Sequence, residues 1–275
     1  EGNEYVPVIT ADGSTIYFCG KGRYDNLGGE DIFVSYLRGL EWSVPELVAD
    51  LSSSSRNEAP ESLTADGTRM NLFISGEIYE SSMTLNGWSE PDLMDESINR
   101  GEWNSDASYT GDGKAVLFTS KREGGYDYGK EYRQGVNAAS DIYVSEINQD
   151  GELEEPINLG PMINTMYSER TPFLHPDMKT LYFSSDGHGG LGGLDVFISK
   201  RLKEDSWTEW SEPINIGKYF NTSGSNWGYK ITTDGKRAYF SEQKSSSENN
   251  QDLFWIKLPP RLRPELVATV KGTLK

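Results

Sequence analysis

The fold of this chain is decided by residues 176–199, which read PDMKTLYFSSDGHGGLGGLDVFIS. A turn containing Asp177 leads into an apolar strand that ends near Phe183, and a glycine-rich connection then leads to a second strand that opens at Asp195. Asp in a tight turn bonds its own backbone, and aromatic and β-branched residues favour strands. The stretch therefore predicts a turn, a strand, a connection and a second, antiparallel strand.

The same three landmarks recur in the same order in five copies along the 275 residues. Glycine follows the turn Asp in four copies, because it supplies the positive φ of the turn, and Met178 takes its place in the fourth copy. The turn residues are Asp12, Asp66, Asp112, Asp177 and Asp234, and the strands that follow contain Phe18, Phe73, Phe118, Phe183 and Phe240. The acidic residues that open the next strand are Asp31, Glu77, Asp141, Asp195 and Asp252.

A fourth landmark, Trp-Ser-x-Pro, follows that strand in three copies and begins at Trp42, Trp88 and Trp210. The third copy keeps only Pro156, and the fifth copy has no such segment. Proline is typical of an edge strand, because it cannot donate to a central ladder. With the segment before each turn, every unit has four short strands joined by loops of variable length, which is typical of a propeller blade. We predict an all-β fold, a β-propeller of four-stranded antiparallel blades, with five blades and six as the alternative.

The propeller is expected to span residues 1–258, because the fifth copy stops after its third strand near Leu258. Three prolines at 259, 260 and 264 make an immediate strand unfavourable, so residues 259–264 are predicted to be a linker. The segment Leu266–Gly272 has the pattern of a strand that opens a following β-sandwich-like domain. Residues 259–275 are therefore assigned to a linker and that first strand.

Composition excludes several classes of function. The chain has 26 Lys and Arg against 43 Asp and Glu, a formal net charge of −17, which repels nucleic acid. The longest apolar runs are only a few residues, too short to span a bilayer. Two histidines and one cysteine leave little for a His-based metal site or a Cys nucleophile, so we predict no metal, no cofactor and no enzymatic activity.

The fourth copy resembles a known family closely, through Pro176 to Asp186, Gly189 to Phe197, and Trp210 to Gly217. These segments are similar to the TolB-like, WD-like propeller repeats of periplasmic OmpA-family lipoproteins of Gram-negative bacteria, and the resemblance covers roughly residues 4–258. It implies a periplasmic protein associated with the outer membrane, which serves as a scaffold for envelope proteins of a type IX secretion or gliding-motility complex. In that family a β-sandwich and a peptidoglycan-binding domain follow the propeller. Attachment to membrane and peptidoglycan would then occur only through domains outside this chain, and no peptidoglycan-binding residue can be carried over.

One set of positions is a candidate binding site at a mouth of the central channel. The residues eight positions before each turn Asp stand near the start of the innermost strand, and in a propeller these starts converge around the channel. They are Glu4, Glu58, Asn104, Glu169 and Asn226. The alternative, which we favour, is that they bond backbone groups at the strand ends.

The insert of the third copy, residues 121–140, is a candidate partner-binding loop. It carries Tyr126, Tyr128, Tyr132 and Arg133, and rigid aromatics and Arg on a long loop are favoured at protein interfaces. Packing of these rings on their own blade is an equal alternative. The acidic residues that open the third strands recur in every copy, so we expect them to make loop hydrogen bonds, although calcium at one of them stays open.

The strongest rival function is a glycan-binding or glycoside-hydrolysing five-bladed propeller. Such an enzyme needs only two carboxylates at a set distance, and 43 acidic residues cannot exclude it. The pair would have to come from non-equivalent residues at the channel mouth, because a catalytic site needs different groups in different roles.

Overall fold

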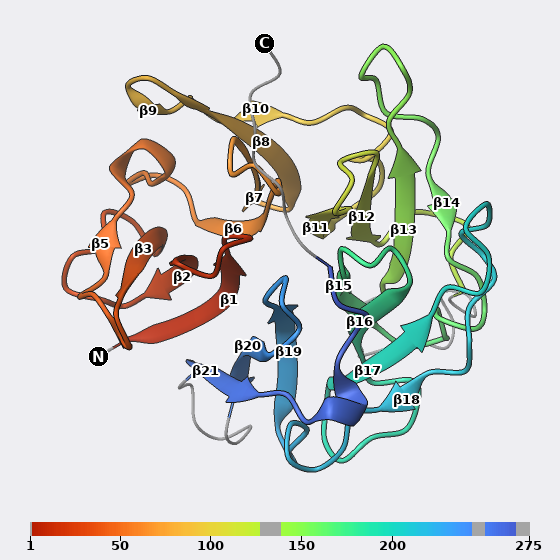
Figure 1. Cartoon of the computed structure of the whole chain (residues 1–275). Coiled ribbons are helices and arrows are strands. Elements are labelled where there is room, and N and C mark those ends of the chain that lie inside the picture. The colour runs from red at the N-terminus through yellow and green to blue at the C-terminus, as the bar shows by residue number, and fades with distance from the viewer. Residues whose placement is uncertain (1, 127–138, 244–250, 268–275) are drawn as a thin grey trace, which may run out of the picture.

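The computed structural model describes residues 2–126, 139–243 and 251–267, and it consists of five antiparallel sheets arranged as blades around a central axis (Figure 1). Blade 1 contains β1 (Asn3–Ile9), β2 (Thr15–Lys21), β3 (Glu30–Arg38), β4 (Glu41–Trp42) and β5 (Glu46–Leu47). Blade 2 contains β6 (Glu58–Leu63), β7 (Arg69–Ile74), β8 (Glu77–Thr84), β9 (Gly87–Trp88) and β10 (Asp92–Leu93). Blade 3 contains β11 (Asn104–Tyr109), β12 (Ala115–Ser120), β13 (Asp141–Glu146) and β14 (Ile157–Asn158). Blade 4 contains β15 (Glu169–Leu174), β16 (Thr180–Ser185), β17 (Asp195–Lys200) and β18 (Ile214–Asn215), and blade 5 contains β19 (Ser225–Ile231), β20 (Arg237–Gln243) and β21 (Gln251–Lys257).

The prediction of a five-bladed, all-β propeller is confirmed. The innermost strands β1, β6, β11, β15 and β19 surround the axis, and the later strands of each blade lie progressively outward (Figure 1). The only helices of the described residues are short 3₁₀ turns, η1 (Ala49–Leu51) and η3 (Pro260–Leu262). Within the same residues, no helix has the length and apolar character needed to cross a membrane.

Each landmark of the repeat has an identifiable structural role. The turn Asp accepts the backbone N–H two residues later, as Asp12 does from Ser14 at 3.0 Å, and so closes the hairpin between the first and second strands. Met178 has φ of 59° where the other four turns have glycine, and the fourth copy therefore keeps the turn with a strained residue. In each Trp-Ser-x-Pro segment, the serine hydroxyl accepts a backbone N–H of the third strand. These bonds are Tyr36 to Ser43 (3.0 Å), Ser82 to Ser89 (3.0 Å) and Lys200 to Ser211 (2.9 Å).

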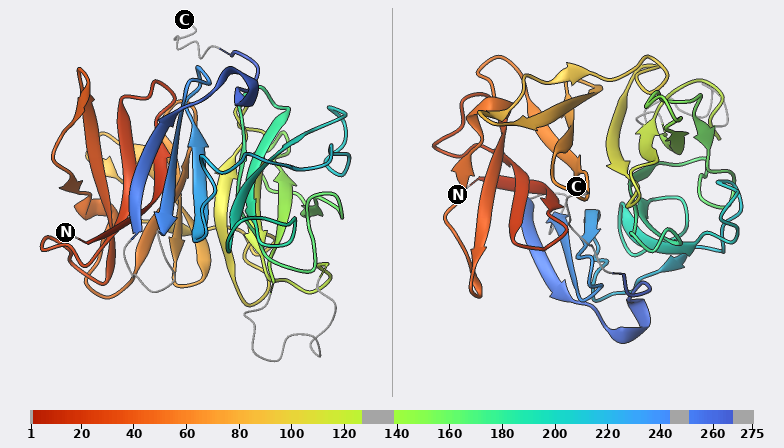
Figure 2. Two further views of the ribbon diagram at one scale, coloured as in Figure 1. Left: turned by 90° about the horizontal axis from the view of Figure 1, so that it is seen from below. Right: turned by 45° about the horizontal axis from the view of Figure 1, so that its top comes forward.

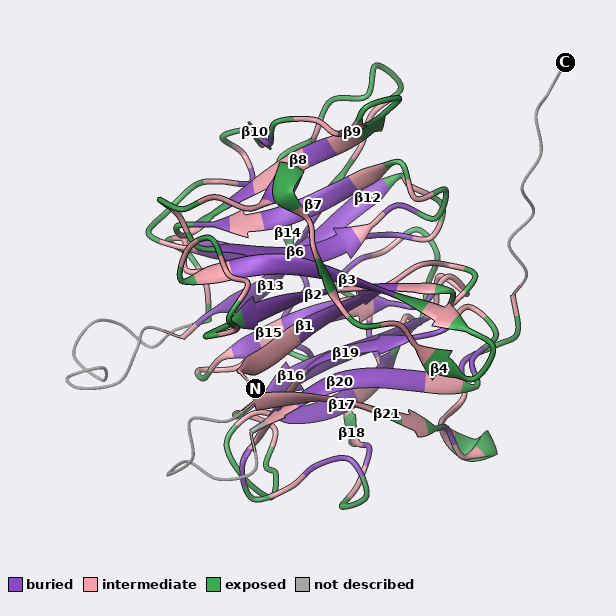
Figure 3. Ribbon diagram, turned by 90° about the vertical axis from the view of Figure 1, so that its left-hand side faces the viewer, coloured by how far each residue is buried: buried purple, intermediate pink, exposed green. Residues whose placement is uncertain are grey.

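The hydrophobic core lies between blades. Its four clusters each combine residues of two neighbouring blades, and Figure 3 shows the strands buried along most of their length while connecting loops are largely exposed. The tryptophans of the outer hairpins cover the preceding blade. Trp88 of blade 2 lies edge-on to Tyr17 of blade 1 at 6.2 Å, and Trp42 of blade 1 lies edge-on to Tyr239 of blade 5 at 6.1 Å. Trp42 thus helps to close the ring.

The fifth blade has three strands in the described residues, as the sequence predicts. Because this copy has no Trp-Ser-x-Pro hairpin, another segment covers blade 4. Leu262 of η3 packs on the cluster around Tyr182, and the Tyr182 hydroxyl donates to the Leu262 carbonyl oxygen at 3.1 Å. The C-terminal segment crosses one face of the propeller in this way (Figure 2), so the predicted linker is a docked part of the fold. Leu266 and Val267 have no regular structure, the rest of the predicted strand lies outside the described residues, and the following domain stays a prediction.

Removing a tryptophan from between two blades should destabilise the fold far more than removing an exposed one. Trp210 is 3% exposed and packs against blade 3, so Trp210→Ala should lower the free energy of unfolding by about 3–5 kcal/mol. Trp255 of β21 is 55% exposed, and Trp255→Ala should cost about 1 kcal/mol or less. Urea titrations of both variants check the difference, and equal losses would contradict the role of the outer hairpin.

Candidate functional site

Every innermost strand is interrupted by a β-bulge near its middle. The register shifts lie between Tyr5 and Val8, Pro60 and Ser62, Ser105 and Ser108, Arg170 and Phe173, and Trp227 and Lys230. Four bulges contain a residue with positive φ: Val6 (52°), Asp106 (60°), Thr171 (48°) and Gly228 (70°). Non-glycine residues in this region carry strain of about 1–3 kcal/mol each, so their recurrence indicates that the surrounding structure imposes it.

The backbone N–H of four of the five bulges is held by a side chain of the preceding blade. The Glu61 carboxylate of blade 2 accepts from Asp106 N at 2.5 Å and from Ala107 N at 2.9 Å in blade 3. In turn, the Asp106 carboxylate accepts from Thr171 N at 3.1 Å in blade 4. The Thr171 hydroxyl accepts from Gly228 N at 3.2 Å in blade 5. These bonds cross three of the five seams and are buried.

At the other two seams the need for an acceptor of the bulge N–H is met in different ways. Between blades 5 and 1, the Ser241 hydroxyl accepts from Val6 N at 3.0 Å and closes the ring. Between blades 1 and 2, the side chain of Val6 is apolar and cannot accept a hydrogen bond. The corresponding residue of blade 2 is Pro60, which has no N–H. Pro60 therefore brings no bulge N–H to this seam that would need an acceptor, and buried donors without partners are costly.

Two of these acceptors belong to a buried cluster of charged groups. Burial, followed by the nearby Asp106 charge, raises the pKa of Glu61 to about 8, against hydrogen bonds that lower it. Burial also acts to raise the pKa of Asp106, but the Arg170 guanidinium, the Thr171 N–H and the Lys230 charge together outweigh burial and hold that pKa below its ordinary value. Arg170 Nε lies 2.5 Å from Asp106 Oδ2, and its guanidinium also stacks on Trp103 at 4.5 Å. Both carboxylates are thus engaged in holding neighbouring blades together.

A cavity of about 860 Å³ opens at the mouth of the channel where the inner strands end. Its wall includes one residue from the equivalent position of every blade, four places before the turn Asp. We call this set the mouth ring: Val8, Ser62, Ser108, Phe173 and Lys230. The turns that follow the inner strands form the rim, and Val267 of the C-terminal segment also lines the cavity. Unlike the landmarks of the repeat, the mouth ring contains four residue types in five copies.

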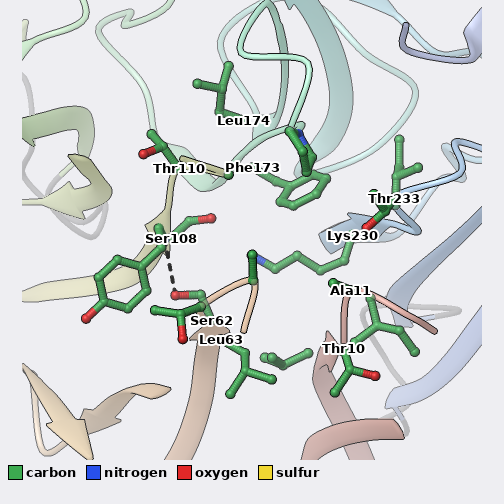
Figure 4. A pocket seen from close by; sticks show the side chains of 18 of the residues that line it. Thr10, Ala11, Ser62, Leu63, Ser108, Thr110, Phe173, Leu174, Lys230 and Thr233 are labelled. Carbon is green, nitrogen blue, oxygen red and sulfur yellow. Dashed lines mark hydrogen bonds between the residues drawn. The ribbon is translucent and has the colours of Figure 1, made fainter. Parts of the chain in front are cut away.

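Lys230 is the charged member of the mouth ring. Figure 4 shows its side chain extended across the cavity beneath Phe173, with the nitrogen directed toward the side that carries Ser62 and Ser108. The residue is 7% exposed, and its ammonium lies 5.4 Å from the centre of the Phe173 ring. Burial lowers the pKa of Lys230 to about 8, opposed by the charges of Asp106 and Glu61, so the group is still mostly protonated at neutral pH.

The five predicted channel-mouth residues lie outside the wall of this cavity. Four of them are buried. Glu58, Glu169 and Asn226 accept backbone N–H groups of the loop before their own strand, from Ser53, Thr165 and Thr222, and Asn104 Oδ1 accepts from the Ser120 hydroxyl at 2.7 Å. Glu4 forms an ion pair with Arg23 at 3.0 Å. These are the contacts of the structural alternative, and a binding role for this set stays a prediction.

The acidic residues that open the third strands bond loops where their contacts are described. Asp31 Oδ2 accepts from Leu27 N and Gly28 N, and Asp141 Oδ2 accepts from Tyr126 N at 2.8 Å. No group of three or more His, Cys, Asp or Glu side chains is placed to hold a metal ion within the described ranges. Tyr126 is 39% exposed, whereas Tyr128, Tyr132 and Arg133 of the predicted partner-binding loop lie outside the described residues.

Sequence reasoning located the repeat, and the cavity lies at the other end of the inner strands from the residues that it selected. Glu58, Asn104 and Glu169 are the first residues of β6, β11 and β15, whereas the mouth ring lies near the ends of the inner strands. Positions eight and four before the turn Asp would share a face in a regular strand, because side chains alternate with a period of two. The bulge between them inserts one residue and reverses the faces. Variability among the copies is the signal that marks the mouth ring, since structural positions repeat while Val8, Phe173 and Lys230 differ in size and charge.

Comparison with known proteins supports the fold and assigns no activity. No protein-family model matches the sequence, and no curated protein matches it. TolB from Acinetobacter baumannii is 18% identical, with a TM-score of 0.56 over 93% of this chain and 52% of that chain. An endo-arabinase from Bacteroides thetaiotaomicron VPI-5482 is 15% identical, with a TM-score of 0.58 over 94% of each chain. The Bacteroides ovatus xyloglucan-locus protein GH43B is 14% identical, with a TM-score of 0.58 over 99% of this chain and 59% of that chain. The chain thus has a TolB-like β-propeller fold and spans about half the length of that TolB chain.

The buried pair of Asp106 and Arg170 should make a pH-dependent contribution to stability. Asp106→Asn leaves Arg170 without its partner and should lower the free energy of unfolding near neutral pH by about 3–5 kcal/mol. The native pKa of Asp106 lies below its ordinary value of 3.8, so its contribution is complete above that value and is lost as the pH falls through the native pKa.

Urea titrations of the wild-type chain and the variant at about pH 7 and about pH 3 measure this dependence. The difference between the two proteins should shrink at the lower pH. Glu41→Gln, at an exposed position, is the matched control and should change the free energy of unfolding by about 0.5 kcal/mol or less. A difference between the wild type and Asp106→Asn that persists undiminished at the lower pH would contradict the assignment.

Proposed function

We propose that this chain is a non-catalytic, protein-binding propeller and that its partner binds at the cavity of the channel mouth. The observation that carries the proposal is the composition of the mouth ring. Where the blades are otherwise built alike, five equivalent positions at the mouth present two apolar side chains, two hydroxyls and one cation. A cavity of this volume with mixed apolar and polar lining is typical of a ligand site.

The lining supports binding rather than glycoside hydrolysis. Among the described residues that line the cavity, Asp66 is the only one with a carboxylate, and it is occupied in its turn by Thr64 and Thr68. Hydrolysis of a glycosidic bond requires two carboxyl groups on either side of that bond. Neither Glu61 nor Asp106 lines the cavity.

A glycosidase remains the second candidate because of one specific observation. Glu61 and Asp106 are adjacent carboxyl groups whose pKa values are shifted in opposite directions, as in many acid and base pairs. The similar folds of the GH43B protein and the endo-arabinase give this candidate a structural precedent. Against it, Glu61 and Asp106 both accept backbone N–H groups of the next blade, and a change of protonation would disturb the ring.

The repeats support a location and a context for the binding function. Their resemblance to the propellers of OmpA-family lipoproteins, and to the PorE component of the type IX secretion system, favours a periplasmic scaffold that joins envelope proteins. In this proposal the propeller holds a protein of the secretion or motility complex, and segments outside this chain provide attachment to the cell wall and outer membrane. The strong negative charge is compatible with a protein partner and unfavourable for nucleic acid.

Blocking the cavity should abolish partner capture without affecting the fold. Ala65 is an exposed rim residue of the cavity, so Ala65→Trp places a large ring over the opening. Leu85→Trp, at the fully exposed tip of the outer hairpin of blade 2, is the matched control. Affinity purification from solubilised native envelopes should recover the same protein with the wild type and Leu85→Trp, and at least about tenfold less with Ala65→Trp. Equal recovery with Ala65→Trp would place the partner elsewhere.

The glycosidase alternative has a separate test. The wild-type chain should release no reducing sugar from arabinan, xylan or xyloglucan, and it should show no binding on a glycan array. Hydrolysis that Glu61→Gln and Asp106→Asn both abolish would replace the proposed function with the alternative.

A further inference from the structure

The ammonium of Lys230 belongs to a buried residue and has no hydrogen-bonding partner among the described residues, although the charges of Asp106 and Glu61 act on it. Within residues 2–126, 139–243 and 251–267, no hydrogen bond or ion pair involves it, and its contact with the Phe173 ring is a cation–π contact at 5.4 Å. Most of the side chain is buried, and it extends into the cavity (Figure 4). A buried ammonium is costly unless it is paired, so a group of this kind aimed into a cavity indicates a ligand of opposite charge.

A second polar group faces the same space. The Ser108 hydroxyl makes no hydrogen bond to any described residue, and it lies on the side of the cavity toward which the Lys230 nitrogen is directed (Figure 4). The neighbouring Ser62 hydroxyl is already used, since it accepts from Asn71 Nδ2 at 3.1 Å and from Tyr109 N at 3.4 Å. The cavity thus offers one cation and one free hydroxyl as anchors.

We propose that Lys230 and Ser108 bind one carboxylate of a protein segment that enters the cavity. The inference rests on the proposed function, because it names the chemistry by which the partner is recognised at that site. Lys230 forms the charge-assisted bond, and Ser108 donates its hydroxyl to the second carboxylate oxygen. The apolar members of the mouth ring, Val8 and Phe173, contact the aliphatic part of the same segment.

A carboxylate fits this site better than a phosphate does. A phosphate dianion is usually held by several cations or by a nest of backbone N–H groups, and among the described residues that line the cavity Lys230 is the only cation. The carboxylates of Glu61 and Asp106 also act on Lys230, and they would repel a dianion more strongly than a monoanion. The chain as a whole carries a charge of −17, so recognition of an acidic segment depends on this local site.

The test uses small probes that separate charge from shape. N-acetyl-leucine carries a carboxylate next to an apolar side chain, N-acetyl-leucinamide is its neutral counterpart, and inorganic phosphate is the competing anion. Titration followed by ligand-observed NMR should show N-acetyl-leucine binding at least about tenfold more tightly than the amide and than phosphate. Lys230→Met should remove the preference for the acid, and Ser108→Ala should weaken it several-fold.

Controls keep this result separate from general charge and from unfolding. Lys218→Met removes an exposed lysine outside the cavity wall and should leave the preference unchanged. Melting temperatures of Lys230→Met and Ser108→Ala should stay close to that of the wild type, since both are near-isosteric changes. Equal binding of acid and amide, tighter binding of phosphate, or a preference retained in Lys230→Met would overturn the proposal.

Further probes identify the source of the carboxylate. Acetyl-Asp-Leu amide presents a side-chain carboxylate and N-acetyl-leucine a chain terminus, so the tighter of the two shows which one the site prefers. If acetate binds as tightly as either probe, the ligand is a small free anion and the protein segment is wrong. If Ala65→Trp abolishes partner capture and Lys230→Met does not, the proposed function stands and this inference fails.

Discussion

The bulge N–H groups of the inner strands are the constraint on which the rest of this propeller depends. Four of the five bulges direct a buried backbone donor across the seam to the preceding blade, where an unpaired donor would be costly. Glu61, Asp106, Thr171 and Ser241 meet that requirement at four seams, and Pro60 removes it at the fifth. This belt of bonds fixes how neighbouring sheets are positioned around the axis, and the cavity of the channel mouth lies beside it. These bonds also engage Glu61 and Asp106, the acidic groups that would otherwise be the first candidates for catalytic residues.

The sequence predicts the fold well because the repeat records local structure. A turn Asp, a positive-φ glycine and an edge proline each act within a few residues, so their recurrence reveals five units and four strands. The tryptophans of the fourth landmark lie against a neighbouring sheet, where Trp42 contacts Tyr239 and Trp88 contacts Tyr17. The docking of Leu262 on blade 4 could not be predicted, because three prolines indicate only that a strand does not follow directly.

The candidate site is harder to predict from the sequence because it depends on β-bulges, and no sequence motif marks their positions. The bulge residues Val6, Asp106, Thr171 and Gly228 have nothing in common in their sequence, yet they share one backbone conformation. The sequence analysis selected Glu58 and Glu169 at the starts of their strands, whereas the cavity wall carries Ser62 and Phe173 near the strand ends.

The pairing of Val6 with Pro60 has a consequence for how the sequences of such propellers change during evolution. Within the described residues the first and last blades share no strand, and the seams consist of side-chain contacts, of bonds to four of the bulges and of single backbone bonds, such as those that Asn104 N donates to the Gly76 carbonyl oxygen and Glu169 N to the Ser140 carbonyl oxygen. One repeat could be exchanged for another without changing the register inside its neighbours, provided that acceptor and donor at the seam change together. Val6 and Pro60 are such a coordinated pair, because the Val6 side chain cannot accept a hydrogen bond and Pro60 has no N–H to donate. Across related chains, these two positions would therefore be expected to vary jointly, although they lie in different sheets and about fifty residues apart.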